Sequence, residues 1–142
     1  MKTGVFCIAL AALYIGAILT GCATTGGAAT PEEDIRIQME RWRTAMIDHD
    51  LDAIMAVFSD KFEHFDWRDK AGARQFIQEA IDIGYLDDIE VHLDQAEIKV
   101  DGTLASVYPV NLAGAFGSLT MELFLTRENG KWLVTGLDAP GM

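Results

Sequence analysis

The chain has 142 residues and a formal net charge of −11, because Asp and Glu outnumber Lys and Arg by 22 to 11. Half of its residues are hydrophobic, which is enough for a single buried core. The acidic balance disfavours nucleic acid as a partner, since such a surface repels phosphate backbones and no basic patch offsets it.

The first 22 residues have the layout of a bacterial lipoprotein signal. Lys2 supplies the positive start, an apolar run follows, and Leu19-Thr20-Gly21-Cys22 places small residues before a cysteine. The apolar run is too short to predict a membrane-spanning helix. The segment resembles lipobox signals, which implies that residues 1–21 are removed and that Cys22 carries a diacylglyceryl anchor. An ordinary cleaved signal with an incidental cysteine is the alternative.

Small residues between Cys22 and Thr30 predict a flexible tether over residues 22–30, ahead of one folded domain over residues 31–142. We therefore expect a cell-envelope protein attached to a membrane through the Cys22 lipid. Ala23 stands where an Asp commonly retains Gram-negative lipoproteins in the inner membrane. Resemblance to that rule implies the outer membrane, facing the periplasm, if the source is Gram-negative. Cys7 leaves with the signal, so the mature chain has no thiol for a disulfide or a thiolate metal site.

Three helices are predicted after the tether. Thr30 fits an N-cap, with Pro31 at the first helical position and Glu33 completing a capping box. Asp50 caps a second short helix, and Asp69 caps a third that ends at Gly84. Residues 62–67 between them are expected to form a strand or an extended bend. The first helix has an apolar stripe of Ile35, Met39, Trp42 and Met46, and the second carries Leu51, Ile54, Met55 and Phe58.

From Asp87 the hydrophobic period changes to two, which predicts strands. In the first stretch every second residue is apolar from Ile89 to Leu93, but from Ala96 to Val100 the apolar residues fall on the alternate positions. A bulge near Asp94-Gln95 would place both sets on the same face of the sheet. A loop that ends at a left-handed Gly102 would set Ile98 opposite Leu104. Further strands are expected over residues 104–112, 117–127 and 131–137, with two-residue turns at Gly114-Ala115 and Asn129-Gly130.

These turns fix a register that places one set of residues on the face toward the helices. The predicted inner face consists of Leu104, Tyr108, Val110, Leu119, Met121, Leu123, Leu125, Trp132 and Val134, with Asp138 continuing it. The predicted outer face includes Ala105, Val107, Phe124, Leu133 and Leu137, which is apolar enough to suggest a homodimer. The fold class is therefore α+β, with three N-terminal helices packed in a curved antiparallel sheet.

The order of these segments carries a resemblance to a known superfamily. Trp42 lies on the first helix, Asp50-Leu51-Asp52-Ala53-Ile54-Met55 leads into Phe58-Ser59-Asp60-Lys61-Phe62, and Asn129-Gly130-Lys131-Trp132-Leu133-Val134 ends the pattern. The chain resembles the nuclear-transport-factor-2-like superfamily, near its SnoaL-like branch. The resemblance implies a cystatin-like cone fold, in which a curved sheet wraps three helices and often leaves a pocket. It does not imply one function, since the superfamily includes isomerases, dehydratases, ligand binders and interaction domains.

Two pairs of residues are candidates for proton transfer. His64 and Asp66 are two apart in the extended segment and share a face, as a general base and its carboxylate partner would. Tyr108 and Asp138 share the predicted inner face, where an apolar pocket would raise the pKa of a carboxyl group. The alternatives are a surface histidine near an acid, a core tyrosine and a strand-end aspartate. No spacing of histidines predicts a metal site, and no cofactor is expected.

The leading hypothesis is a non-catalytic domain that binds a small apolar ligand or a partner protein. An isomerase or dehydratase is the second hypothesis, and a structural homodimer with a filled cone, acting in envelope assembly, is the third. The candidate pocket-lining residues are Trp42, Met46, Phe58, Phe62, Tyr108, Met121 and Leu123.

Overall fold

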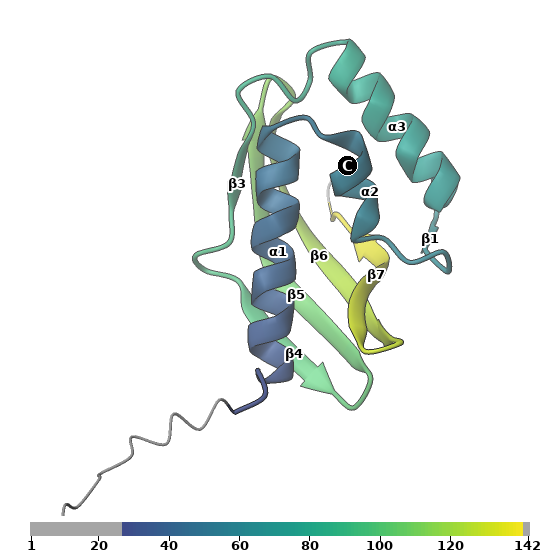
Figure 1. The fold of residues 1–142 in the computed structure, drawn as a ribbon. Coiled ribbons are helices and arrows are strands. Elements are labelled where there is room, and N and C mark those ends of the chain that lie inside the picture. The colour runs from purple at the N-terminus through teal and green to yellow at the C-terminus, as the bar shows by residue number, and fades with distance from the viewer. Residues whose placement is uncertain (1–26, 141–142) are drawn as a thin grey trace, which may run out of the picture.

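The computed structural model describes residues 27–140, which form three helices, a five-stranded antiparallel sheet and a two-stranded hairpin (Figure 1). The predicted signal segment and Cys22 lie outside the described residues. The α+β fold class is confirmed: the helices lie on one side of a curved sheet (Figure 1).

All three helices begin where their capping residues predict, but α2 ends before Phe58, which the sequence placed on it. In α1 (Pro31–Ile47), the Glu33 N–H donates to Thr30 Oγ1 at 3.2 Å and the Thr30 N–H donates to Glu33 Oε2 at 2.9 Å. The caps of α2 (Leu51–Ala56) and α3 (Lys70–Asp82) are the predicted aspartates, Asp50 and Asp69. Gly84, with φ of 76°, follows the end of α3.

The sheet contains β3 (Glu90–His92), β4 (Glu97–Asp101), β5 (Leu104–Gly114), β6 (Gly117–Glu128) and β7 (Lys131–Asp138). Both β3 and β4 pair with β5, which is followed by β6 and β7. The chain leaves the ladder between β3 and β4, near the predicted break at Asp94-Gln95. As a result Val91, opposite Leu112, and Ile98, opposite Val107, both face the helices.

The three predicted turns differ in outcome. The Asn129-Gly130 turn is confirmed, with φ of 49° and 79° at its two residues. The turn between β5 and β6 lies one residue later than predicted, because Gly114 pairs with Gly117. Gly102 is left-handed as predicted, with φ of 61°, but Ile98 pairs with Val107 and not with Leu104.

A bulge in β5 changes which residues of that strand face the helices. Pairing with β6 is interrupted between Val107 and Val110, so Tyr108 and Pro109 lie opposite a single residue. Proline has no N–H to donate to the ladder, which explains why the bulge forms there. The predicted inward positions of Leu104 and Tyr108 are therefore wrong: the two side chains are 58% and 48% exposed. Ala105 and Val107 are buried in their place.

A second bulge changes the end of β7. Leu125 pairs with Val134 but Phe124 pairs with Gly136, so Thr135 is the extra residue. Leu137 therefore lies opposite Leu123 on the inner face, and Asp138 is exposed on the outer face. Both placements reverse the prediction.

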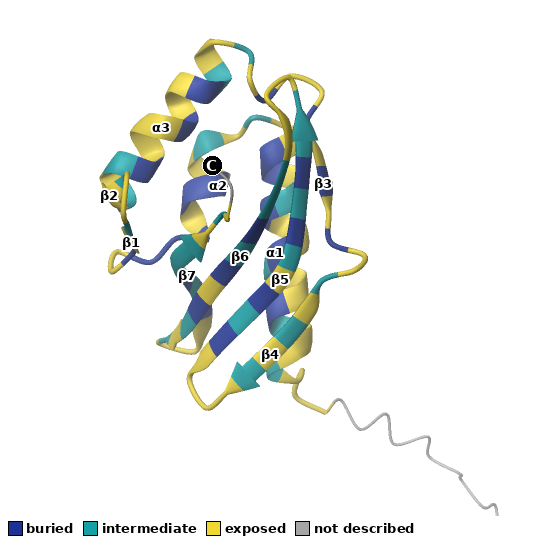
Figure 2. Cartoon of the chain, turned by 180° about the vertical axis from the view of Figure 1, so that it is seen from behind, coloured by how far each residue is buried: buried dark blue, intermediate teal, exposed yellow. Residues whose placement is uncertain are grey.

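The core lies between the inner face of the sheet and the helices, and Figure 2 shows buried and exposed positions alternating along β5 and β6. Its buried residues fall within 35–134. Ser59 is the one buried polar residue between residues 27 and 140. It ties the segment after α2 to the sheet, because its hydroxyl donates to Glu128 Oε1 at 2.7 Å and accepts the Lys61 N–H at 2.9 Å.

Candidate functional site

A cavity of about 370 Å³ lies between the helices and the inner face of the sheet. Helices α1 and α3 contribute one wall, and β5, β6 and β7 contribute the other. The α3–β3 loop and the β5–β6 turn meet at one end, where the Tyr85 carbonyl oxygen approaches Gly114. The cavity is lined by Trp42, Met46, Phe58, Trp67, Phe76, Ile77, Ala80, Tyr85, Leu86, Ile89, Leu112, Phe116, Ser118, Leu119, Met121, Leu123 and Leu137.

The lining is apolar and uncharged. None of its side chains is a carboxylate, a lysine, an arginine or a histidine, and the hydroxyl groups come only from Tyr85 and Ser118. Six of its residues are aromatic, and two are methionines, which adapt to irregular shapes. Such a surface binds by burial and stacking, and it holds no acid–base pair for proton transfer.

An aromatic stack closes the side of the cavity that faces the two-stranded hairpin, β1 (Glu63–His64) and β2 (Arg68–Asp69). The rings of Trp67 and Phe76 stack at 4.6 Å, and the His64 ring lies 4.4 Å from the Trp67 ring. His64 Nδ1 accepts the backbone N–H groups of Asp66 and Trp67 at 3.3 and 3.4 Å. His64 therefore holds the turn that presents Trp67 to the cavity.

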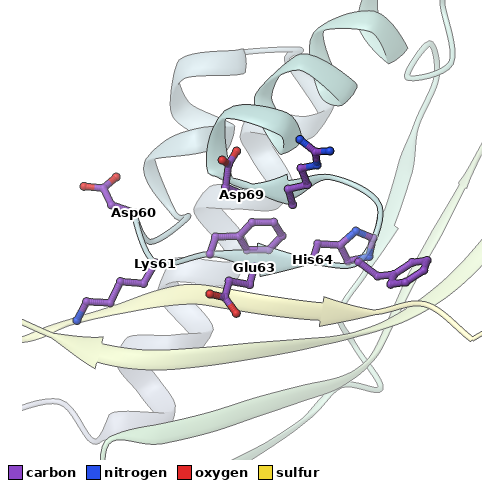
Figure 3. Close-up of a pocket in the computed structure, with 8 residues that line it drawn as sticks. Asp60, Lys61, Glu63, His64 and Asp69 are labelled. Atoms are coloured by element: carbon purple, nitrogen blue, oxygen red, sulfur yellow. The ribbon is translucent and has the colours of Figure 1, made fainter.

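The hairpin itself forms a shallow polar hollow outside the cavity (Figure 3). Asp60, Lys61, Glu63, His64 and Asp69 surround it (Figure 3). Asp66 is exposed on this hairpin, and the hydrogen bond to His64 comes from its backbone. The predicted pairing of the Asp66 carboxylate with the imidazole is not what the geometry shows.

Five of the seven predicted pocket-lining residues lie on the cavity wall: Trp42, Met46, Phe58, Met121 and Leu123. Phe62 is 1% exposed, packs edge-on against Phe58 at 5.0 Å, and borders the hairpin hollow instead. Tyr108 lies on the outer face because of the β5 bulge. The structure therefore keeps Tyr108 and Asp138 away from the cavity that they were predicted to enter.

Within residues 27–140, no three His, Cys, Asp or Glu side chains are grouped so as to hold a metal ion. In the same range, no helix is long and apolar enough to cross a membrane.

No family model matches the sequence, and no curated protein does. Solved structures match with high probability. A protein of unknown function with a cystatin-like fold from Nostoc punctiforme is 16% identical, with a TM-score of 0.63 over 80% of this chain and 96% of that one. An NTF2-like protein from Pseudomonas putida is 20% identical, with a TM-score of 0.64 over 76% and 84%. Another from Shewanella oneidensis is 14% identical, with a TM-score of 0.64 over 78% and 98%.

The chain has the NTF2-like cone fold. At these identities the likeness establishes the fold, which hosts many functions, and leaves the function to be argued from the cavity.

Several lining residues of this cone were not recognised from the sequence. Trp67 and Phe76 come from the hairpin and from α3, and Tyr85 and Phe116 come from two loops that meet only in the fold. The signal present in the sequence was an aromatic residue beside each loop glycine, at Gly84-Tyr85 and Phe116-Gly117. Large aromatic side chains at turn positions are unusual unless they cover something.

Proposed function

We propose that this protein is anchored in the cell envelope by a lipid on Cys22 and that its cone-fold domain binds a small apolar ligand without catalysis. The observation that carries the binding proposal is the uncharged aromatic cavity of about 370 Å³. Its volume falls in the usual range for small-molecule sites. The anchor, and an outer-membrane position facing the periplasm in a Gram-negative source, rest on the sequence of residues 1–23.

The proton-transfer alternative is supported less well by the geometry. Of its four candidate groups, Tyr108 and Asp138 lie on the outer face of the sheet, and Asp66 is exposed on the hairpin. The fourth, His64, accepts two backbone N–H groups through Nδ1. A general acid or base must reach the reacting atom within about 3 Å, or through one water. The side chains that line the cavity offer only the hydroxyls of Tyr85 and Ser118.

Native mass spectrometry of residues 23–142, produced in a periplasm without the lipid cysteine, tests ligand binding directly. This form retains the core, whose buried residues lie within 35–134. A reproducible added mass of small-molecule size is the expected result and would identify the ligand. Bare protein that also fails to bind an apolar dye would contradict the proposal and favour a partner protein or a structural role.

Filling the cavity from α3 is expected to abolish binding. Ala80 is buried on the cavity wall, whereas Ala71 is exposed on the same helix. Ala80→Phe places a phenyl ring where the ligand would lie, so we expect binding of N-phenyl-1-naphthylamine, measured by its fluorescence, to fall by at least about tenfold. Ala71→Phe makes the same change on the solvent side and should leave binding unchanged. Equal binding by both variants, with matching circular dichroism, would place the ligand elsewhere.

We also propose that the outer face of the sheet forms a homodimer. Phe124 is 40% exposed there, beside the exposed Leu104, and Figure 2 shows this face over β4, β5 and β6. Clustered exposed apolar side chains are typical of interaction sites. Sedimentation at high micromolar concentration should show a dimer, and Phe124→Lys should shift it to monomer by burying a charge at the interface. A wild-type protein that sediments only as monomer would contradict this.

A further inference from the structure

The charges around the cavity restrict what its ligand can carry. We infer that the site takes apolar ligands whose polar end is neutral or cationic, and that it rejects ligands of the same shape that end in a carboxylate, sulfonate or phosphate. This inference rests on the proposed function and adds a ligand class to it.

The first argument is the absence of a counter-charge among the lining residues. An anion moved from water into this cavity would lose hydration and meet neither a lysine, an arginine nor a histidine side chain. Two hydroxyl groups, from Tyr85 and Ser118, can solvate an alcohol or a ketone adequately. They do not balance a full negative charge.

The second argument is the character of the rings. Trp42, Phe58, Trp67, Phe76, Tyr85 and Phe116 all contribute to the lining. The face of an aromatic ring carries partial negative charge, which attracts ammonium groups and repels anions. Each ring that presents its face to a ligand therefore favours a cation over an anion even without formal charges.

The third argument is the charge of the loop at the open end of the cavity. Tyr85, Phe116 and Ser118 line the cavity but are exposed, so the cavity opens at the end formed by the α3–β3 loop and the β5–β6 turn, which is its mouth. Tyr85 and Leu86 line the cavity, and exposed Asp87 and Asp88 follow them directly. From Gln75 to Ile98 the chain has no lysine or arginine. Its carboxylates in that stretch are Glu79, Asp82, Asp87, Asp88, Glu90, Asp94 and Glu97.

The basic residues on α3 and the hairpin form ion pairs or lie outside the cavity, so they do not supply the missing positive charge. Lys70 Nζ lies 2.9 Å from Asp60 Oδ1, and Arg74 Nη2 lies 2.6 Å from Asp52 Oδ1. Arg68, next to Trp67, lines the hairpin hollow outside the cavity. The field at the mouth is therefore set mainly by the acidic loop, which attracts cations and repels anions.

Three probes with the same ten-carbon chain test the inference: decyltrimethylammonium, decanol and decanoate. Each competes with bound N-phenyl-1-naphthylamine at pH 8 and low salt, below its micelle-forming concentration, on the soluble form of residues 23–142. We expect the ammonium and the alcohol to displace the dye, and decanoate to bind at least about tenfold more weakly than decanol. Decanoate that binds as tightly as decanol would overturn the inference while leaving apolar binding intact. Failure of the dye itself to bind would overturn the proposed function.

A charge introduced into the wall provides the converse test. Leu119 is half-buried on the lining, where a lysine can extend its ammonium group toward the mouth. Leu119→Lys should raise the affinity for decanoate at least about tenfold relative to Leu119→Met, an unbranched and uncharged control. Unchanged decanoate binding in a Leu119→Lys protein that still binds decanol would show that a missing counter-charge is not the cause, and would overturn the inference.

Discussion

Replacing Cys22 with alanine is expected to abolish the incorporation of labelled palmitate into this protein. The thiol of Cys22 is the proposed attachment point of the diacylglyceryl group, and alanine offers no atom for the thioether. A single fourteen-carbon chain binds membranes only marginally, with an association constant of about 10⁴ M⁻¹, whereas two or three chains anchor stably. Alanine leaves no site for any of these chains, so the lipid-anchored form should be lost completely, and not merely reduced.

Cys7 supplies a matched control, because it lies in the segment that the signal hypothesis removes. Cys7→Ala should leave palmitate labelling and membrane attachment unchanged, and the intact mass of the detergent-extracted protein should begin at a lipidated Cys22. Palmitate labelling of the Cys22→Ala protein, or an unmodified cysteine in the extracted wild type, would contradict the lipoprotein assignment. In that case residues 1–21 would be an ordinary cleaved signal.

The starts of the helices could be predicted from sequence because they are set by local chemistry. Thr30, Asp50 and Asp69 each cap a backbone N–H three residues ahead, so a short window of sequence contains the whole interaction. The Asn129-Gly130 turn is equally local, since both residues tolerate positive φ. These features do not depend on distant parts of the chain.

The faces of the sheet could be predicted only as far as the first bulge. Each bulge adds one residue to a strand and so reverses the facing of every residue beyond it. Moving the two-residue turn one residue along the chain shifts the pairing by two residues, so Val110 keeps its predicted facing, and only beyond the bulge at Tyr108-Pro109 is the facing reversed. Pro109 and Gly136 were the available signals, since neither residue suits the interior of a strand.

Part of the cavity lining could be predicted because local periodicity identifies some of its residues. Trp42 and Met46 follow from the stripe of α1, and Met121 and Leu123 follow from strand alternation, so local periodicity suffices for them. Trp67 and Phe116 lie on separate loops that converge only after folding. Single-sequence periodicity carries no information about such convergence.

Phe62 and Phe65 offer the sharpest test of how the hairpin packs. Although the two residues are three apart, the same substitution should lower the free energy of unfolding strongly at one and hardly at all at the other. Phe62 is 1% exposed and contacts Phe58, while Phe65 is 95% exposed at the hairpin turn. Truncating a buried phenylalanine removes its transfer free energy and leaves a cavity, so Phe62→Ala should lower the free energy of unfolding by about 3 to 5 kcal/mol. Phe65→Ala should change it by no more than about 0.5 kcal/mol.

Urea unfolding of the soluble domain, followed by tryptophan fluorescence, measures both values. The midpoint should fall sharply for Phe62→Ala while the slope stays constant, since a constant slope indicates a change in stability and not in the compactness of either state. Because domains of this size are stabilised by about 5 to 15 kcal/mol, Phe62→Ala would remove a large fraction of the total. Similar midpoints for the two variants would mean that Phe62 is not packed beneath the cavity wall. The Phe62 ring, which lies 6.4 Å from that of Trp67, would then give Trp67 no support, and His64 would have to hold it alone.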